Sequence, residues 1–303
     1  MSVDRWTDDS VRRSSRQARD GRRIQGMAVI EVQGLLKRYG RHTAVDGIAL
    51  AIAPGEVFGL LGPNGAGKTT TVEILEGYRR RDGGDVRVLG EDPDSAGRRW
   101  RSRLGIVPQG AQDGAELTVR EMVRHVASFY PAPRDPEEVI ARCGLEEKAG
   151  ARLRTLSGGQ RRRVDVACGI VGGPELLFLD EPTTGFDPEA RRAFWALIRD
   201  LAEDGTTIVL TSHYLDEVEA LATRLAVLSG GRIVAEGTPG TIGGRTAESI
   251  ISWHDGNGAQ RVVTDEPLPL LAALTGRATP VTDLRVQPRS LEDVYLELIG
   301  EAK

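Results

Sequence analysis

Short apolar runs, each followed by a polar residue, alternate with stretches of helical periodicity through the middle of the chain. Helical patterns lie between the runs, for example at 188–201 and 214–222. Strands that alternate with helices predict a mainly parallel sheet, and therefore an α/β fold. The four runs with the length and apolar character of buried strands are 57–61, 104–108, 176–179 and 207–212.

Two further parts are predicted before and within this alternating region. Residues 1–27 are rich in arginine and almost devoid of apolar residues, which predicts a disordered tail. The Arg12-Arg13 pair is not followed by an apolar stretch, so we reject a twin-arginine export signal. Residues 110–170 contain the helical patterns 121–130 and 136–145 and are predicted to form an inserted helical subdomain.

A C-terminal accessory domain is predicted over residues 241–303. It contains strand patterns at 249–253 and 261–263, followed by a last helix that begins with a capping box of Ser290 and Asp293. This helix carries an apolar stripe, which predicts burial against the main domain or against a dimer mate. The stripe consists of Leu291, Val294, Tyr295, Leu298 and Ile299.

The segment after the first apolar run matches G-x-x-x-x-G-K-[ST], the phosphate-binding P-loop. Its glycines let several N–H groups point at one spot, and the following helix adds its positive N-terminal end. Lys68 is then placed to reach β- and γ-phosphates, and the Thr69 hydroxyl to hold Mg²⁺. A nucleoside triphosphate is the predicted ligand. The segment consists of Gly62, Pro63, Asn64, Gly65, Ala66, Gly67, Lys68 and Thr69.

Polar residues suited to nucleotide chemistry follow the other three apolar runs. They are Gln109, the pair Asp180 and Glu181, and His213. Because ligands of parallel sheets bind beyond the carboxyl ends of the strands, these residues are expected to converge on the P-loop. Asp180 is expected to support Mg²⁺, and Glu181 to polarise the attacking water. A helix N-cap after a strand is the alternative for the acidic pair.

Tyr39 and the helix after His213 admit simpler interpretations. Tyr39 could stack on an adenine ring or lie in the core. Asp216 and Glu217 are expected to lie on a solvated helical face.

Composition excludes several classes of protein. The chain has 303 residues, of which 40% are hydrophobic and 28% charged, as in ordinary globular proteins. Its net charge of −4 argues against a general affinity for nucleic acid. No stretch approaches the roughly 18 apolar residues of a membrane span, so any membrane crossing would fall to another chain. Two isolated cysteines, Cys143 and Cys168, fit a reducing compartment.

Leu156, Ser157, Gly158, Gly159 and Gln160 form a second glycine-rich segment, LSGGQ, ahead of a helical pattern. Its serine can cap the helix, and its glycines allow an anion to approach the first amides. Taken alone, the segment is either a weaker phosphate site or a glycine-rich cap. An ordinary P-loop kinase or GTPase would not explain it.

The motifs in this order resemble the ATP-binding subunit of an ABC transporter. The resemblance covers roughly residues 28–240, and Gly185 to Pro188 resembles the D-loop of the family, with Phe186 where leucine is usual. It implies that Tyr39 stacks on adenine, that Gln109 senses Mg²⁺ and water, and that His213 contacts the γ-phosphate. The other residues that it implies contact nucleotide are Thr70, Ser157, Gly158, Gly159, Gln160 and Asp187.

The resemblance also implies partners and a location. It implies a homodimer holding two ATP molecules between the P-loop of one copy and the LSGGQ of the other. A transmembrane permease of the ABC-2 type would bind this dimer at the cytoplasmic face of the cell membrane. The tail from Arg289 to Leu296 resembles that of drug-resistance ATPases, which favours multidrug export. A ribosome-associated or chromosome-maintenance ABC ATPase is the alternative.

Overall fold

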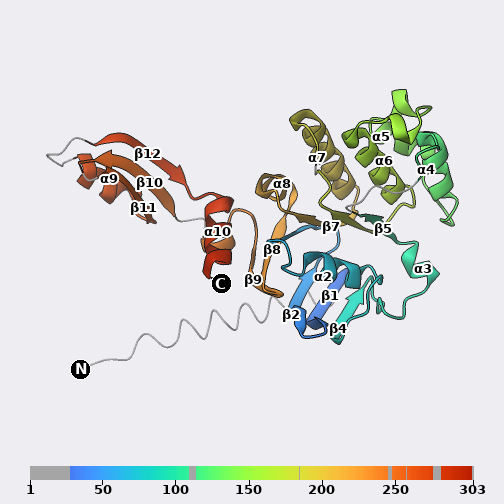
Figure 1. The fold of residues 1–303 in the computed structure, drawn as a ribbon, viewed down its shortest axis with the longest axis horizontal. Coiled ribbons are helices and arrows are strands. Elements are labelled where there is room, and N and C mark those ends of the chain that lie inside the picture. The colour runs from blue at the N-terminus through green and yellow to red at the C-terminus, as the bar shows by residue number, and fades with distance from the viewer. Residues whose placement is uncertain are drawn as a thin grey trace.

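The computed structural model describes residues 28–108, 114–183, 185–244, 248–256, 258–275 and 281–301. The predicted tail at 1–27 and Gln109 lie outside these residues. The described residues form three sheets and the helices around them (Figure 1). No helix among the described ranges is long and apolar enough to cross a membrane.

The central sheet has six strands in the order β5-β6-β7-β3-β8-β9. All neighbouring pairs are parallel except β8 with β9. Every residue of β3 and β7 is buried, which is why apolar residues dominate β3 and fill the middle of β7. The predicted parallel sheet is confirmed. Its strands are β3 (Val57–Leu61), β5 (Leu104–Val107), β6 (Leu176–Asp180), β7 (Thr207–Ser212), β8 (Arg224–Ser229) and β9 (Arg232–Gly237).

A three-stranded antiparallel sheet, in the order β2-β1-β4, precedes most of the central sheet in the chain. It consists of β1 (Ile30–Tyr39), β2 (His42–Ile52) and β4 (Gly83–Val88). Its apolar residues share one core with α2 (Lys68–Leu75) and with Phe58 of β3. The buried ring of Trp100, in α3 (Arg98–Arg101), closes this core and donates its N–H to the Val88 carbonyl at 2.8 Å.

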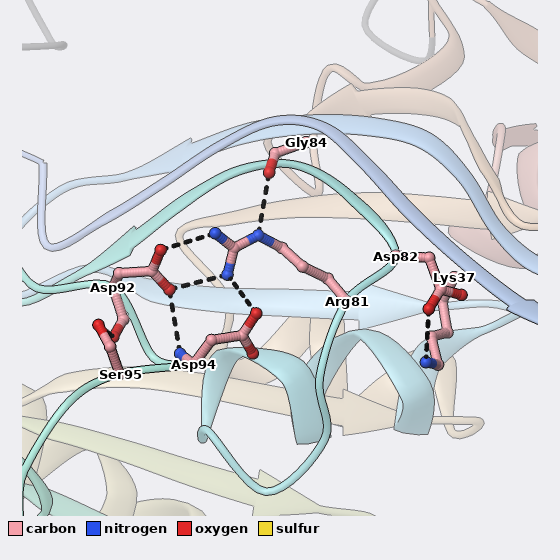
Figure 2. A network of polar contacts seen from close by, with 7 residues as sticks. All are labelled: Lys37, Arg81, Asp82, Gly84, Asp92, Asp94 and Ser95. Atoms are coloured by element: carbon pink, nitrogen blue, oxygen red, sulfur yellow. Dashed lines mark hydrogen bonds and ion pairs between the residues drawn. The ribbon is translucent and has the colours of Figure 1, made fainter.

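Ion pairs hold the loop after α2 against this sheet (Figure 2). The Arg81 guanidinium binds both oxygens of Asp92, at 2.8 and 2.6 Å, and also Asp94 at 2.8 Å. Asp82, directly before β4, accepts from the ammonium of Lys37 on β1 at 3.0 Å and from the Arg38 N–H at 2.7 Å. The contacts of Asp82 hold the end of β1, where Tyr39 lies.

The helical insertion lies between β5 and β6, as the sequence predicts. Two of its helices start with complete capping boxes, formed by Thr118 with Glu121 and by Ser157 with Gln160. The insertion and the helices α7 (Pro188–Glu203) and α8 (Leu215–Leu221) contribute to a second core on the sheet. Its elements are α4 (Val119–Ala127), α5 (Pro136–Arg142), η1 (Glu146–Lys148), η2 (Leu153–Thr155) and α6 (Gly158–Ile170).

The C-terminal segment forms a small sheet and a helix that returns to the main core. The sheet has the order β11-β10-β12 and packs Ile251 and Trp253 with Leu274 of a short helix. The sequence left open whether the last helix packs on the main domain or on a dimer mate. Its residues Leu291 and Val294 lie in the same core as α8, so the helix packs on the main domain. The elements are η3 (Ile242–Gly244), β10 (Ser249–Asp255), β11 (Gly258–Thr264), α9 (Pro267–Thr275), β12 (Thr282–Pro288) and α10 (Leu291–Glu301).

The solvated face expected on the helix after His213 is confirmed for one residue only. Asp216 is exposed and forms an ion pair with Arg191 at 3.1 Å. Glu217 is fully buried, and its carboxylate accepts from the Ser212 hydroxyl at 2.6 Å. The expectation was wrong for Glu217 because Ser212, at the end of β7, supplies a partner that helical periodicity does not reveal.

Truncating α10 at its buried end should destabilise the main core. Leu291→Ala is expected to lower the free energy of unfolding by about 2–5 kcal/mol, the usual cost of a buried leucine. Leu296→Ala, on the same helix but 56% exposed, should change it by less than about 0.5 kcal/mol. Urea unfolding measures both variants, and equal values would contradict the packing of α10.

Stability should depend on pH through Glu217. Burial raises the pKa of its carboxyl above the ordinary value of 4.5. Above pH 4.5 the unfolded chain therefore loses this proton while the folded protein keeps it, so the free energy of unfolding falls as pH rises. Glu217→Gln removes the titration and should reduce this decline.

The matched control for this pH dependence is Glu219→Gln, on the exposed side of the same helix. Urea unfolding of the three proteins over a range of pH gives the comparison. If the free energy of unfolding fell with pH at the same slope in the wild type and in Glu217→Gln, the role of the buried carboxyl would be contradicted.

Candidate nucleotide-binding site

The P-loop joins the end of β3 to the start of α2 and curls around one point. Ala66 donates its N–H to the Pro63 carbonyl at 3.1 Å, and Gly231 donates to the Ala66 carbonyl at 3.2 Å. Gly67 has a φ of 100°, and a Cβ there would lie 2.4 Å from the Ala44 carbonyl oxygen. Only glycine fits this position, which is why the loop can approach a ligand with its backbone.

Lys68 lies buried at the start of α2, with 7% of its surface exposed. Its ammonium donates to the carbonyls of Gly62, at 2.6 Å, and Pro63, at 3.2 Å. Desolvation lowers the pKa of this ammonium, while the nearby carboxylates of Glu181 and Asp180 act to raise it. The loop thus holds a positive charge beneath the free N–H groups of a helix N-terminus, which is a cradle for an anion.

The acidic pair lies at the end of β6, beside this cradle. Asp180 accepts from the Thr211 hydroxyl of the adjacent strand β7. Glu181 has a φ of 46°, which is unusual for a residue with a side chain, and its N–H donates to the Thr211 carbonyl at 3.1 Å. Its carboxylate lies 3.2 Å from Nδ1 of His213, which follows β7.

A pocket of about 760 Å³ brings together the residues predicted for one ATP site, except Asp180, which is not in its lining, and Gln109, which is outside the described residues. Tyr39 faces it with 42% of its surface exposed, and Lys37 and Arg79 place their charges 5.6 and 5.4 Å from its ring centroid. An exposed ring fits the stacking role better than the core alternative. The lining consists of Tyr39, His42, Ala44, Gly62, Pro63, Asn64, Gly65, Ala66, Gly67, Lys68, Thr69, Thr70, Glu181, His213 and Tyr295.

The sequence did not assign three of these lining residues to the nucleotide site. His42 and Ala44 come from β2, which carries no motif for chemistry. Tyr295 comes from α10, where the apolar stripe predicted burial but not its neighbours. The only signal in the sequence was the position of Tyr295 in the apolar stripe. A buried helix face must contact another element, but the stripe does not say which one.

The LSGGQ segment lies in a different pocket, of about 570 Å³. Ser157 accepts from the Gln160 N–H at 3.3 Å, which confirms the predicted cap. Asp187 shares this pocket and caps α7 through the amides of Glu189, at 3.0 Å, and Ala190, at 2.8 Å. This segment and the P-loop therefore line separate pockets of the same chain.

The donors present suit a magnesium ion that is held mainly by phosphate and water. Thr69 lies exposed at the P-loop, and Asp180 presents a carboxylate at the neighbouring strand end. Groups of three or more His, Cys, Asp or Glu that could hold a metal are absent from the described part of the chain. Mg²⁺ commonly takes only one or two protein ligands beside nucleotide phosphates, so the set is sufficient.

Residues 45–184 match the family model described as ABC transporter. The chain is 39% identical to the Nod factor export ATP-binding protein I of Paraburkholderia xenovorans (strain LB400), over 90% of this chain and 97% of that relative. It is 37% identical to the daunorubicin/doxorubicin resistance ATP-binding protein DrrA of Streptomyces peucetius, over 91% and 94%. Because each alignment covers about nine-tenths of the chain, it includes at least part of the C-terminal segment 241–303.

The fold agrees with these relatives. The structure matches a dimeric bacterial ABC transporter cassette with a TM-score of 0.63 and 24% identity, over 69% of this chain and 98% of that one. The resemblance given by the motifs is confirmed. The chain therefore belongs to the ABC transporter family, as an ATP-binding subunit of the kind that hydrolyses ATP to power transport.

Proposed function

We propose that this chain powers an exporter, with multidrug or antibiotic efflux as its task, through a separate ABC-2 type permease. Two relatives with export or drug resistance in their names, aligned over nine-tenths of the chain, support this proposal. They favour it over a ribosome-associated or chromosome-maintenance ATPase. The proposed location is the cytoplasmic face of the cell membrane, reached through the permease.

The pocket supports a division of roles around ATP. Tyr39 stacks on the adenine, and the P-loop amides with Lys68 bind the β- and γ-phosphates. Thr69 and Asp180 would hold Mg²⁺, with Gln109 as a further ligand, and the ion would neutralise charge on the phosphates. The observation that carries the proposal is the meeting of Glu181 and His213 with the P-loop in one pocket.

Glu181 is the proposed general base. Its carboxylate accepts a proton from water as the water oxygen bonds to the γ-phosphorus. The bond from that phosphorus to the β,γ-bridging oxygen breaks, which releases ADP and phosphate. His213, 3.2 Å from Glu181, orients the carboxylate and contacts the γ-phosphate.

A homodimer completes each site in this proposal. The LSGGQ pocket contains a capped helix N-terminus, which suits a phosphate. Because this pocket is separate from the ATP pocket of the same chain, a second copy is needed to bring the two together. The ATP of one copy would then contact Ser157 and Gly159 of the other.

Glu181→Gln should retain ATP binding and lose turnover. The amide keeps the size of the side chain but cannot accept the proton, so kcat should fall by about 10²–10⁴-fold. ATP affinity from a fluorescent-nucleotide titration should change little. Glu203→Gln, an exposed residue at the end of α7, is the matched control and should behave as the wild type.

The same variants test export when they are co-expressed with a candidate ABC-2 type permease. Cells with the wild type should accumulate less drug than cells with Glu181→Gln. Full efflux by a variant that no longer hydrolyses ATP would refute the proposed coupling. Equal accumulation in both strains, with intact ATPase activity in the wild type, would refute drug export while leaving the ATPase assignment in place.

ATP should dimerise the Glu181→Gln variant, because closed sites persist when hydrolysis is blocked. Size-exclusion chromatography with light scattering should show a dimer with ATP and Mg²⁺ and a monomer without nucleotide. Adding Ser157→Arg should keep ATP binding and abolish the dimer, since the long cation occupies the place of the partner's phosphate. A dimer unaffected by Ser157→Arg would contradict the proposed arrangement.

A further inference from the structure

We propose that Arg162 is a positioning residue that holds the backbone of Glu181 and connects it to the LSGGQ helix. This inference rests on the proposed role of Glu181 as the base. It concerns a residue that lies outside both pockets and that no motif marks, the middle one of three consecutive arginines. Its side chain points from α6 into the protein and is only 9% exposed.

The guanidinium of Arg162 binds three backbone carbonyls from two strand ends. Nη2 donates to the Asp180 carbonyl at 2.7 Å, and Nε donates to the Pro182 carbonyl at 3.1 Å. Nη1 donates to the carbonyl of Pro108, directly after β5. Asp180 and Pro182 are the two neighbours of Glu181, so this one side chain holds the backbone on both sides of the proposed base.

Glu181 needs such support because its backbone is in the left-handed region, with a φ of 46°. Side-chain-bearing residues adopt that region only where surrounding contacts impose it. Thr211 binds the Glu181 N–H from β7, and Arg162 binds the adjoining carbonyls from α6. The direction of the Glu181 carboxylate therefore depends on α6 as well as on the sheet.

The choice of arginine follows from the geometry of the contacts. A guanidinium carries five N–H donors in a rigid planar fork, so it can bind three separate carbonyls at once. Its charge lies 3.9 Å from the carboxylate of Asp165, on the same helix, which offsets part of the cost of burial. A lysine ammonium is a single point of donors and cannot span the same carbonyls.

The position of Arg162 on α6 gives the contact a further consequence. The helix begins at Gly158, is capped by Ser157, and reaches Arg162 little more than one turn later. A ligand that moves or orders the first turn of α6 therefore acts on a side chain bound to the peptide units around Glu181. In the proposed dimer, engagement of ATP by LSGGQ would thus be transmitted to the base of the same chain.

Arg162→Gln and Arg162→Lys test this positioning role in the full-length chain. Arg162→Gln should lower kcat by about 10²-fold, the effect of misplacing a reacting group, while KM and the affinity for ATP stay within about twofold. Arg162→Lys keeps the charge but only some of the hydrogen bonds to the carbonyls, so its kcat should lie between those of the wild type and Arg162→Gln. Arg199→Gln is the matched control, because Arg199 also donates to a carbonyl, that of Ala220, but is exposed.

A double variant shows whether Arg162 acts through Glu181. If it does, Arg162→Gln should reduce the residual turnover of Glu181→Gln by less than about threefold, although it costs about 10²-fold in the wild-type background. Melting temperatures of the same samples establish that the variants are folded, and ATP titrations establish that they bind ATP.

Three outcomes would overturn the positioning role. They are wild-type kcat in Arg162→Gln, parallel loss of ATP affinity and kcat, and failure of both variants to fold, which would make Arg162 a purely structural residue. The proposed function fails separately, if the wild type does not hydrolyse ATP or if Glu181→Gln retains full turnover.

Discussion

The site depends on the burial of one positive charge, the Lys68 ammonium, inside a loop of backbone. Burial of an ammonium is costly, and the pKa of Lys68 is lowered for that reason. Two carbonyls and two nearby carboxylates offset part of this cost. A triphosphate brings more negative charge to the same place. Binding of the nucleotide therefore relieves an electrostatic cost that the folded protein already bears.

The order of the strands places the acidic pair and His213 near the Lys68 ammonium. β3 lies between β7 and β8, and β6 lies on the other side of β7. The P-loop, the acidic pair and His213 consequently follow three adjacent parallel strands at one edge of the sheet. Local backbone completes the arrangement, because Gly67 permits close approach of β2 and Glu181 adopts a left-handed conformation under external restraint.

The sequence predicted most of the fold because its signals were local. Strands 57–61 and 207–212 agree with β3 and β7 residue for residue, since buried parallel strands are rich in apolar and β-branched residues. The caps at Ser157 and Ser290 follow from residues three apart. Arg162 escaped prediction because the carbonyls that it binds are 18 to 54 residues away in the sequence. The partner of Glu217, Ser212, is near in the sequence but belongs to the preceding strand β7 and not to the same helix. Neither a buried carboxyl under Ser212 nor a guanidinium on strand-end carbonyls leaves a periodic signal.

Packing links the C-terminal helix to the nucleotide site more closely than its place in the sequence indicates. Val294 contacts the backbone turn at Gly243, and both Val294 and Leu291 belong to the core that contains β3 and α8. The next residue, Tyr295, lines the ATP pocket. Because successive residues on a helix cannot move independently, the packing of α10 and the shape of that pocket are coupled. The small sheet beyond α10 has its own core, so α10 is the element that joins it to the ATPase part.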